Sequence, residues 1–189
     1  ELPRGLQGHI QRTRAVAGQL AFWHDVDAAP VDLAAASHDL ARAIKGDALL
    51  EEARRHGLQN SPIEEMLPVL LHGAVAAHWL ERSQGIHDGQ VLEAVRWHST
   101  GRRGMGPVAK VVFLADKLDP KKVERFPDLK QVRELARETL DRAILAYLDR
   151  ELAYLLQKGS LIHPESLELR NELIEAERVG NGDPGTVHE

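Results

Sequence analysis

The chain has 189 residues, a formal net charge of −5 and a hydrophobic fraction of 43%, which is typical of an ordinary soluble protein with one domain. It contains no cysteine, which excludes disulfide frameworks, thiolate metal sites and a cysteine nucleophile, and which fits a cytoplasmic protein. The acidic balance argues against nucleic acid as the main partner. No apolar run reaches the roughly 18 residues of a membrane span, so we expect no membrane partner.

Apolar residues recur three or four positions apart in almost every segment, which predicts an all-α fold. In chain order, the predicted helices span residues 5–24, 30–44, 46–57, 61–82, 88–98, 108–118 and 128–157, with a last helix from Pro164. Ser61 and Asp88 are expected to act as N-caps, and Pro68 is expected to kink or restart its helix. One helical domain is expected over 1–178, followed by a disordered tail at 179–189.

The segment AAASHDLARA, at 34–43, places adjacent His38 and Asp39 in a run of small helix-forming residues. Neighbouring helical residues lie about 100° apart around the axis, so the two side chains can reach one ion from adjacent sides, or one of them can reach a second ion. The alternative is that both residues belong to a polar helix start capped by Ser37.

Four further polar residues stand in apolar or small-residue surroundings: His9, His72, His98 and Asp116. Asp116 follows the apolar run VVFLA, and a carboxylate there is costly to bury without a partner. A cation would offset that cost for Asp116 and Asp39 together. Nitrogen and oxygen ligands without sulfur suit Fe, Mn, Co, Ni or Zn.

The order His9, His38-Asp39, His72, His98 and Asp116 resembles the H…HD…H…H…D pattern of the HD-domain metallohydrolases. The closer resemblance, over roughly residues 2–174, is to the symmetrical bis(5′-nucleosyl)-tetraphosphatases of the YqeK family. It rests on LPRGLQGHIQRT, SHDLAR, LLHGAVAA, GIHDGQVLEAVRWHSTG, KVVFLADKLDP and GSLIHPESLELRN. The chain departs from the family pattern at Ser99-Thr100, where the family has Thr-Thr, and at Lys121-Lys122, where it has an arginine after the proline.

The resemblance implies a single HD-domain helical bundle that hydrolyses diadenosine tetraphosphate (Ap4A) to two nucleoside diphosphates, here ADP, with a pair of divalent metals, iron favoured. It implies that Asp39 is the catalytic residue that bridges the two ions. The implied ligands are His9, His38, Asp39 and Asp116 on one metal, and His72 and His98 with Asp39 on the other.

A highly anionic dinucleoside polyphosphate requires cations around the metals. Arg12 is three residues from His9 on its helix, Arg42 is four from His38, and the loop GRRGMG follows His98 directly. The alternatives are that Arg42 pairs with Asp39 and that the loop is a solvated basic turn. The predicted substrate-binding residues are Arg12, Arg42, Ser99, Thr100, Gly101, Arg102, Arg103, Lys110 and Lys122.

The other histidines are expected to have structural or surface roles: His24, His56, His78, His87, His163 and His188. Two other functions remain open from the sequence. One is a different HD-type reaction, such as nucleotide phosphatase or cyclic-nucleotide phosphodiesterase activity, and the other is a nucleotide sensor without turnover. A homodimer is also left open.

Overall fold

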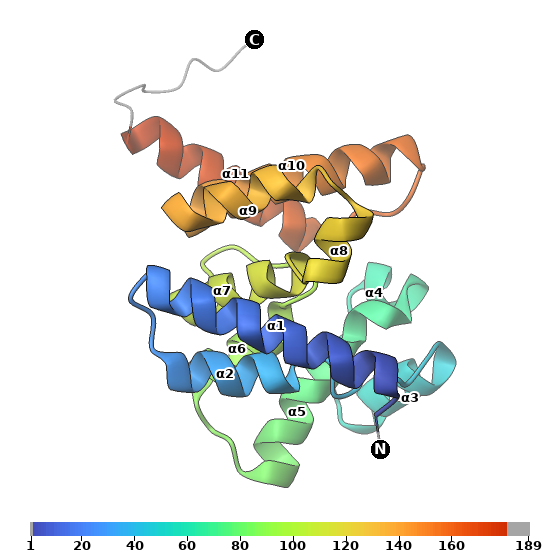
Figure 1. The fold of residues 1–189 in the computed structure, drawn as a ribbon. Helices are drawn as coiled ribbons and strands as arrows, with labels where there is room; N and C mark the ends of the chain where they lie inside the picture. The colour runs from blue at the N-terminus through green and yellow to red at the C-terminus, as the bar shows by residue number, and fades with distance from the viewer. Residues whose placement is uncertain (1, 181–189) are drawn as a thin grey trace.

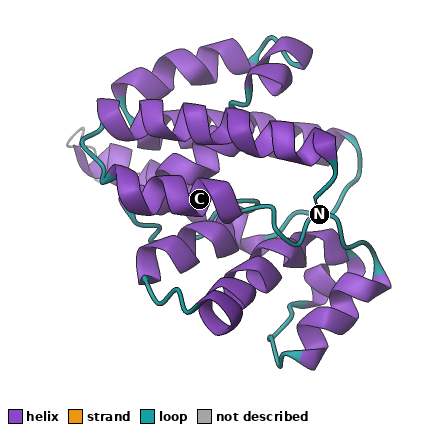
Figure 2. Cartoon of the chain, turned by 60° about the horizontal axis from the view of Figure 1, so that its bottom comes forward, coloured by secondary structure: helices purple, strands orange, loops and turns teal. Residues whose placement is uncertain are grey.

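The structure, a computed structural model, describes residues 2–180, and it confirms the all-α fold. No strand occurs among these residues (Figure 2), and none of their helices combines the length and apolarity that crossing a bilayer requires. The elements are α1 (Arg4–Trp23), α2 (Ala28–Ser37), α3 (Asp47–Arg55), α4 (Pro62–Met66), the 3₁₀ helix η1 (Pro68–Leu71), α5 (His72–Gln84), α6 (Gly89–Trp97), α7 (Pro107–Lys117), α8 (Pro120–Arg125), α9 (Leu129–Glu138), α10 (Leu140–Gln157) and α11 (Pro164–Gly180).

Helix α7 lies at the centre of the fold, and nine of its eleven residues are buried. Its sequence is apolar around most of its circumference, which suits a helix with neighbours on every side. Helices α1, α2, α6 and α10 all pack against it. Figure 1 shows α1 and α2 on one side of α7 and the layer of α9, α10 and α11 on the other. The carboxyl end of α7 is therefore enclosed by several elements.

The predicted helix starts agree with the structure where capping residues mark them. Ser61 forms a capping box with Glu64 at the start of α4, and Asp88 accepts the first backbone N–H groups of α6. The predicted restart at Pro68 appears as the 3₁₀ helix η1, after which the chain continues into α5. This restart places His72 at a helix start.

The expected continuation of the second helix to Ile44 is wrong, because α2 ends at Ser37. The backbone N–H groups of Leu40, Arg42 and Ile44 bond to carbonyls three residues back, so the chain winds through successive tight turns. The imidazole Nδ1 of His38 bonds to a carbonyl of the last turn of α2. The His-Asp pair therefore stands in the turn that follows the helix.

The single helix expected at 128–157 is two helices, α9 and α10, which meet at Thr139. Thr139 is extended, with φ −146° and ψ 137°, and its hydroxyl accepts the N–H of Arg142 as the N-cap of α10. The spacing of apolar residues continues across the break, so the prediction from periodicity treated the two helices as one.

Helix α8 was not predicted from the sequence. Asp119 caps it by accepting the N–H of Lys121, and Pro120 occupies its first position. This short helix reverses the chain beyond α7 and brings Lys122 back to that helix. At the other end of the chain, α11 extends to Gly180, and the rest of the predicted tail lies outside the described residues.

Candidate metal centre

The six predicted metal ligands meet at one point between the helices. They come from α1 (His9), the turn after α2 (His38 and Asp39), the start of α5 (His72), the turn after α6 (His98) and the end of α7 (Asp116). His38 and His98 are almost completely buried, and the side chain of His9 is the most exposed of the set at 14%. Helix ends and turns supply most of the ligands, because side chains there can point along the helix axes into a shared space.

The two carboxylate oxygens of Asp39 face different pairs of histidines. Oδ2 lies 3.6 Å from Nε2 of His9 and 3.6 Å from Nε2 of His38. Oδ1 lies 3.1 Å from Nε2 of His72 and 3.6 Å from Nε2 of His98. The Asp39 carboxylate therefore lies between two pairs of imidazole rings.

Each of the four histidines turns its Nδ1 atom away from the centre, toward an oxygen. The acceptors are the carbonyls of Ala35 for His38 (2.8 Å), Val95 for His98 (2.8 Å) and Val69 for His72, and the Asp119 carboxylate for His9 (2.7 Å). Since a carbonyl and an ionised carboxylate can only accept, Nδ1 carries the proton and the Nε2 lone pair faces the centre. This is the arrangement that orients metal-ligating histidines in proteins.

The facing lone pairs indicate that the cluster is built around cations. Nε2 of His72 lies 2.9 Å from Nε2 of His98, and Nε2 of His9 lies 3.3 Å from that of His38, contacts that repel unless a positive charge stands between them. Ligand atoms bound at about 2.1 Å to one ion are roughly 3.0–3.4 Å apart. Among the described residues, two groups of three each bring their ligand atoms within 4.8 Å of one another. The groups are His9, His38 and Asp116, and His38, Asp39 and His98. These residues fit divalent metals.

Charge and burial keep the cluster ready to bind a cation. Burial lowers the pKa of His98 to about 3, so its imidazole is neutral at physiological pH. Burial alone would raise the pKa of the Asp116 carboxyl, but the charges of Lys117 and Lys122 and the hydrogen bond from His9 together outweigh burial and hold that pKa well below its usual value. For His9, burial alone would lower the pKa of the imidazole, but hydrogen bonds to Asp116 and Asp119 raise it above its usual value. A proton therefore competes with a cation at His9.

Two lysines bond to Asp116. Nζ of Lys117 lies 2.8 Å from Oδ2 and also donates to the His98 carbonyl at 2.9 Å, and Nζ of Lys122 lies 2.6 Å from Oδ1. Lys122 was among the predicted substrate-binding residues, whereas Lys117 was missed. The signal for Lys117 is its place beside Asp116 at the end of an apolar helix, where a buried ammonium needs a carboxylate.

Asp119 was also missed in the sequence analysis, although its carboxylate accepts a hydrogen bond from Nδ1 of His9, on the side of the ring that faces away from the centre. Its side chain is 3% exposed and accepts two bonds from Arg12, from Nε at 2.6 Å and from the guanidinium NH2 group at 2.9 Å. Burial opposes ionisation, but the bonds from Arg12 and His9 lower the pKa of Asp119 to about 2. The structure therefore places Arg12 on Asp119, and contact between Arg12 and phosphate stays a prediction. The sequence signal for Asp119 was its place before Pro120.

A cavity of about 530 Å³ lies over the cluster. Three predicted substrate-binding residues line it: Arg42, Ser99 and Lys122. Ser99 Oγ lies 3.2 Å from Nε2 of His98, so its hydroxyl is at the edge of the ligand set. The cavity thus combines metal ligands, two cationic side chains and a small hydroxyl.

The other predicted substrate-binding residues have partners elsewhere. Arg102 pairs with Glu93 (3.3 Å), Arg103 with Glu175 (2.7 Å) and Lys110 with Asp141 (2.6 Å), and the Thr100 hydroxyl bonds to the Gly101 carbonyl (2.9 Å). Gly101 has φ +66°, and a Cβ atom there would overlap with the Leu169 side chain. The structure gives these residues roles in packing and ion pairing, and their contact with substrate stays a prediction.

The remaining histidines of the described region lie outside the ligand set. Nε2 of His24 bonds to the Ala136 carbonyl at 2.7 Å, and the rings of His56 and His78 lie 4.5 Å apart. His163 is buried beside the start of α11, where its Nδ1 accepts the N–H of Glu165. His188 lies outside the described residues.

Known proteins resemble this chain in sequence. The HD domain family model matches residues 6–121. The chain is 33% identical to a symmetrical bis(5′-nucleosyl)-tetraphosphatase from Halalkalibacterium halodurans, over 82% of this chain and 81% of the relative. It is 29% identical to a protein of the same name from Staphylococcus aureus, over 90% of this chain and 88% of the relative.

A solved structure shows the same fold. It is the crystal structure of a protein from Clostridium acetobutylicum described as a predicted HD superfamily hydrolase involved in NAD metabolism. The TM-score is 0.88 at 27% identity, with 93% of this chain and 92% of that chain covered. The order of the predicted ligands along the chain, the family model and the relatives all indicate the same family. The chain belongs to the HD domain family, in the branch of the symmetrical bis(5′-nucleosyl)-tetraphosphatases.

Proposed function

We propose that this protein is a metal-dependent hydrolase that cleaves Ap4A symmetrically to two molecules of ADP. The observation that carries the proposal is the position of Asp39, whose two oxygens face separate imidazole pairs beneath a cavity of about 530 Å³. The relatives from Halalkalibacterium halodurans and Staphylococcus aureus are named for symmetrical tetraphosphatase activity, which supports the same reaction here.

The ligand geometry supports two metal ions for each chain. His9, His38 and Asp116 would hold one together with Oδ2 of Asp39, and His72 and His98 would hold the other together with Oδ1. The resemblance favours iron, and Mn, Co, Ni or Zn also suit these ligands. When bound, such a pair lowers the pKa of a water molecule and neutralises charge on the phosphoryl oxygens during in-line displacement.

The chain's own cations would bind the polyphosphate. Arg42 and Lys122 line the cavity, and Lys122 bonds to Oδ1 of Asp116, the same oxygen that lies 3.1 Å from Nε2 of His9. The Lys122 side chain is 40% exposed, so its ammonium would be able to reach a phosphate in the cavity. Charge-assisted bonds to phosphate are among the strong hydrogen bonds of proteins.

Symmetrical cleavage places the reaction at the central anhydride. Oxygen from water bonds to one of the two central phosphorus atoms, and the bond from that phosphorus to the bridging oxygen breaks. The bridging oxygen leaves as part of the second ADP. Because ADP is a good leaving group, the site needs no strong general acid, which agrees with the unprotonated Asp39 and Asp116 carboxylates that the low pKa values imply.

Product analysis tests this proposal against the two alternatives. The metal-loaded protein is incubated with Ap4A, and separately with a mononucleotide and a cyclic nucleotide, and the products are separated by chromatography. We expect ADP as the sole product from Ap4A. AMP with ATP, or phosphate from a mononucleotide, would support a different HD-type reaction. Tight nucleotide binding without turnover under every divalent metal would support a sensor. Homodimer formation and a cytoplasmic location stay predictions.

A further inference from the structure

A second cavity of about 420 Å³ adjoins the metal site and lies between α8 and α10. Lys122 lines both cavities, so the two spaces meet at this side chain. A volume of this size is within the range of about 300–1,000 Å³ that small-molecule sites have. A ligand bound at the metals could therefore extend past Lys122 into the second cavity.

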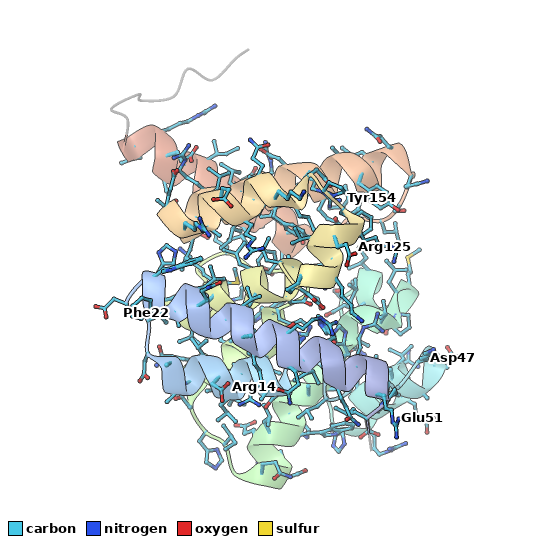
Figure 3. The ribbon with its side chains drawn as sticks, viewed as in Figure 1. Arg14, Phe22, Asp47, Glu51, Arg125 and Tyr154 are labelled. Atoms are coloured by element: carbon cyan, nitrogen blue, oxygen red, sulfur yellow. The ribbon has the colours of Figure 1, made fainter. Side chains whose placement is uncertain are left out.

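Aromatic rings gather in this second cavity. The whole chain has two tyrosines and three phenylalanines, and both tyrosines, Tyr147 and Tyr154, line the cavity together with Phe126. Tyr154 is 51% exposed and Phe126 is 40% exposed, so part of each side chain faces solvent. Figure 3 shows Tyr154 on α10 and Arg125 on α8 at the same edge of the molecule. In a chain with 4% aromatic residues, this grouping indicates a stacking surface.

The charges change along the path from the metal site into the aromatic cavity. Lys122 is at the junction and is 40% exposed at its side chain. Further in, Arg150 is paired with both Asp128 and Glu151, and its guanidinium lies 5.4 Å from the centre of the Phe126 ring. The interior of the cavity is therefore aromatic with compensated charges, whereas its entrance from the metal site is cationic.

We propose that the aromatic cavity binds the base and ribose of one nucleoside of a substrate whose phosphates lie at the metal centre. This inference rests on the proposed function and adds a base-binding subsite to it. The base stacks on Tyr154 and Phe126, and the Glu151 carboxylate accepts a hydrogen bond from an exocyclic amino group of the base. The subsite therefore favours nucleosides whose base carries an amino group, such as adenosine.

Equilibrium binding to the metal-loaded protein tests the subsite separately from turnover. Binding of ADP and of inorganic pyrophosphate is measured by calorimetry for wild type, Tyr154→Ala, Tyr154→Phe and Phe126→Ala. Loss of base stacking costs about 1–3 kcal/mol, so each alanine variant should weaken ADP binding by about 5- to 150-fold. Pyrophosphate binding should not change, and Tyr154→Phe should bind ADP like wild type. The matched control is Phe22→Ala, an aromatic residue that is 85% exposed at the opposite edge of the molecule (Figure 3).

The outcomes separate this proposal from the proposed function. Unchanged ADP binding in both alanine variants, or equal losses for ADP and pyrophosphate at an unchanged Tm, would overturn the subsite even if Ap4A is cleaved to ADP. A selective loss of ADP binding would support the subsite even if the protein fails to hydrolyse Ap4A, in which case the proposed function alone would be refuted.

Discussion

Substitution of Asp119 by asparagine removes the negative charge that binds two side chains of α1, His9 and Arg12. The carboxylate is almost fully buried, bonds to Nδ1 of His9 at 2.7 Å and receives two bonds from Arg12 at 2.6 and 2.9 Å. An asparagine amide is neutral, and it can present its oxygen to only one of these two partners. His9 therefore loses the anionic acceptor that orients its ring, or Arg12 loses its counter-charge.

The expected effect has two parts. Removal of an outer partner of a metal-ligating histidine typically costs about 10- to 100-fold in metal affinity or activity, and we expect that range for Asp119→Asn. Stability should fall by about 2 kcal/mol, the scale of a hydrogen bond to a charged group, because Arg12 is only 28% exposed. Metal content by mass spectrometry, kcat/KM with Ap4A and Tm are measured on the same preparation.

A matched control uses Arg14, which lies on α1 like Arg12. Arg14 donates two bonds to Asp32 of α2, both at 2.8 Å, but the Asp32 side chain is 53% exposed and lies outside the ligand set. Asp32→Asn should leave metal content and kcat/KM unchanged, since exposed ion pairs are screened by solvent. If Asp119→Asn kept normal metal affinity and normal kcat/KM, the assignment of Asp119 as the residue that positions His9 would be refuted.

Three further predictions follow from the ligand set and the packing around it. Asp39→Ala should abolish hydrolysis and lower bound metal, whereas His78→Ala should keep both; normal activity at normal metal content in Asp39→Ala would remove the proposed site. Chelation should lower Tm, and re-addition of the metal should restore it, since a metal at 100 times its Kd adds about 2.7 kcal/mol to the free energy of unfolding; a Tm indifferent to chelator would argue against a bound metal. Gly101→Ala should destabilise the protein by about 1–3 kcal/mol, and by more than Gly104→Ala. Both glycines have positive φ, but only a Cβ atom at Gly101 meets the Leu169 side chain. Equal shifts in Tm would contradict this account of Gly101.

Part of the ligand set could be anticipated from the local sequence, because two of the predicted ligands follow apolar runs. Asp116 ends VVFLA and His72 follows VLL, so their burial was readable from their neighbours, and burial of such groups requires a partner. The order of the ligands along the chain then matched a known pattern. Helix starts at Ser61 and Asp88 were readable for a similar reason, since capping is a local interaction.

The errors concern interactions that periodicity does not encode. The break at Thr139 depends on one backbone rotation, and the turns after Ser37 depend on a histidine that bonds back to its own helix. Arg103 pairs with Glu175, a residue far along the chain, so the sequence did not show this ion-pair partner of the loop. Long-range ion pairs of this kind become visible only once the helices are packed.

The pairing of Lys117 and Asp119 with the ligands shows the same limit. Both residues belong to the segment KVVFLADKLDP, but their partners, the His98 carbonyl and Arg12, come from other helices. A residue that hydrogen-bonds to a ligand can lie at any distance from it along the chain. The sequence therefore predicted the residues that face the centre and missed their hydrogen-bond partners.

Metal analysis of anaerobically purified protein, combined with product analysis of Ap4A in the same sample, tests the central claim most directly. The account predicts two divalent ions for each chain, ADP as the only product, and loss of hydrolysis when the ions are removed. Equal amounts of AMP and ATP, or hydrolysis that persists in metal-stripped protein, would contradict it.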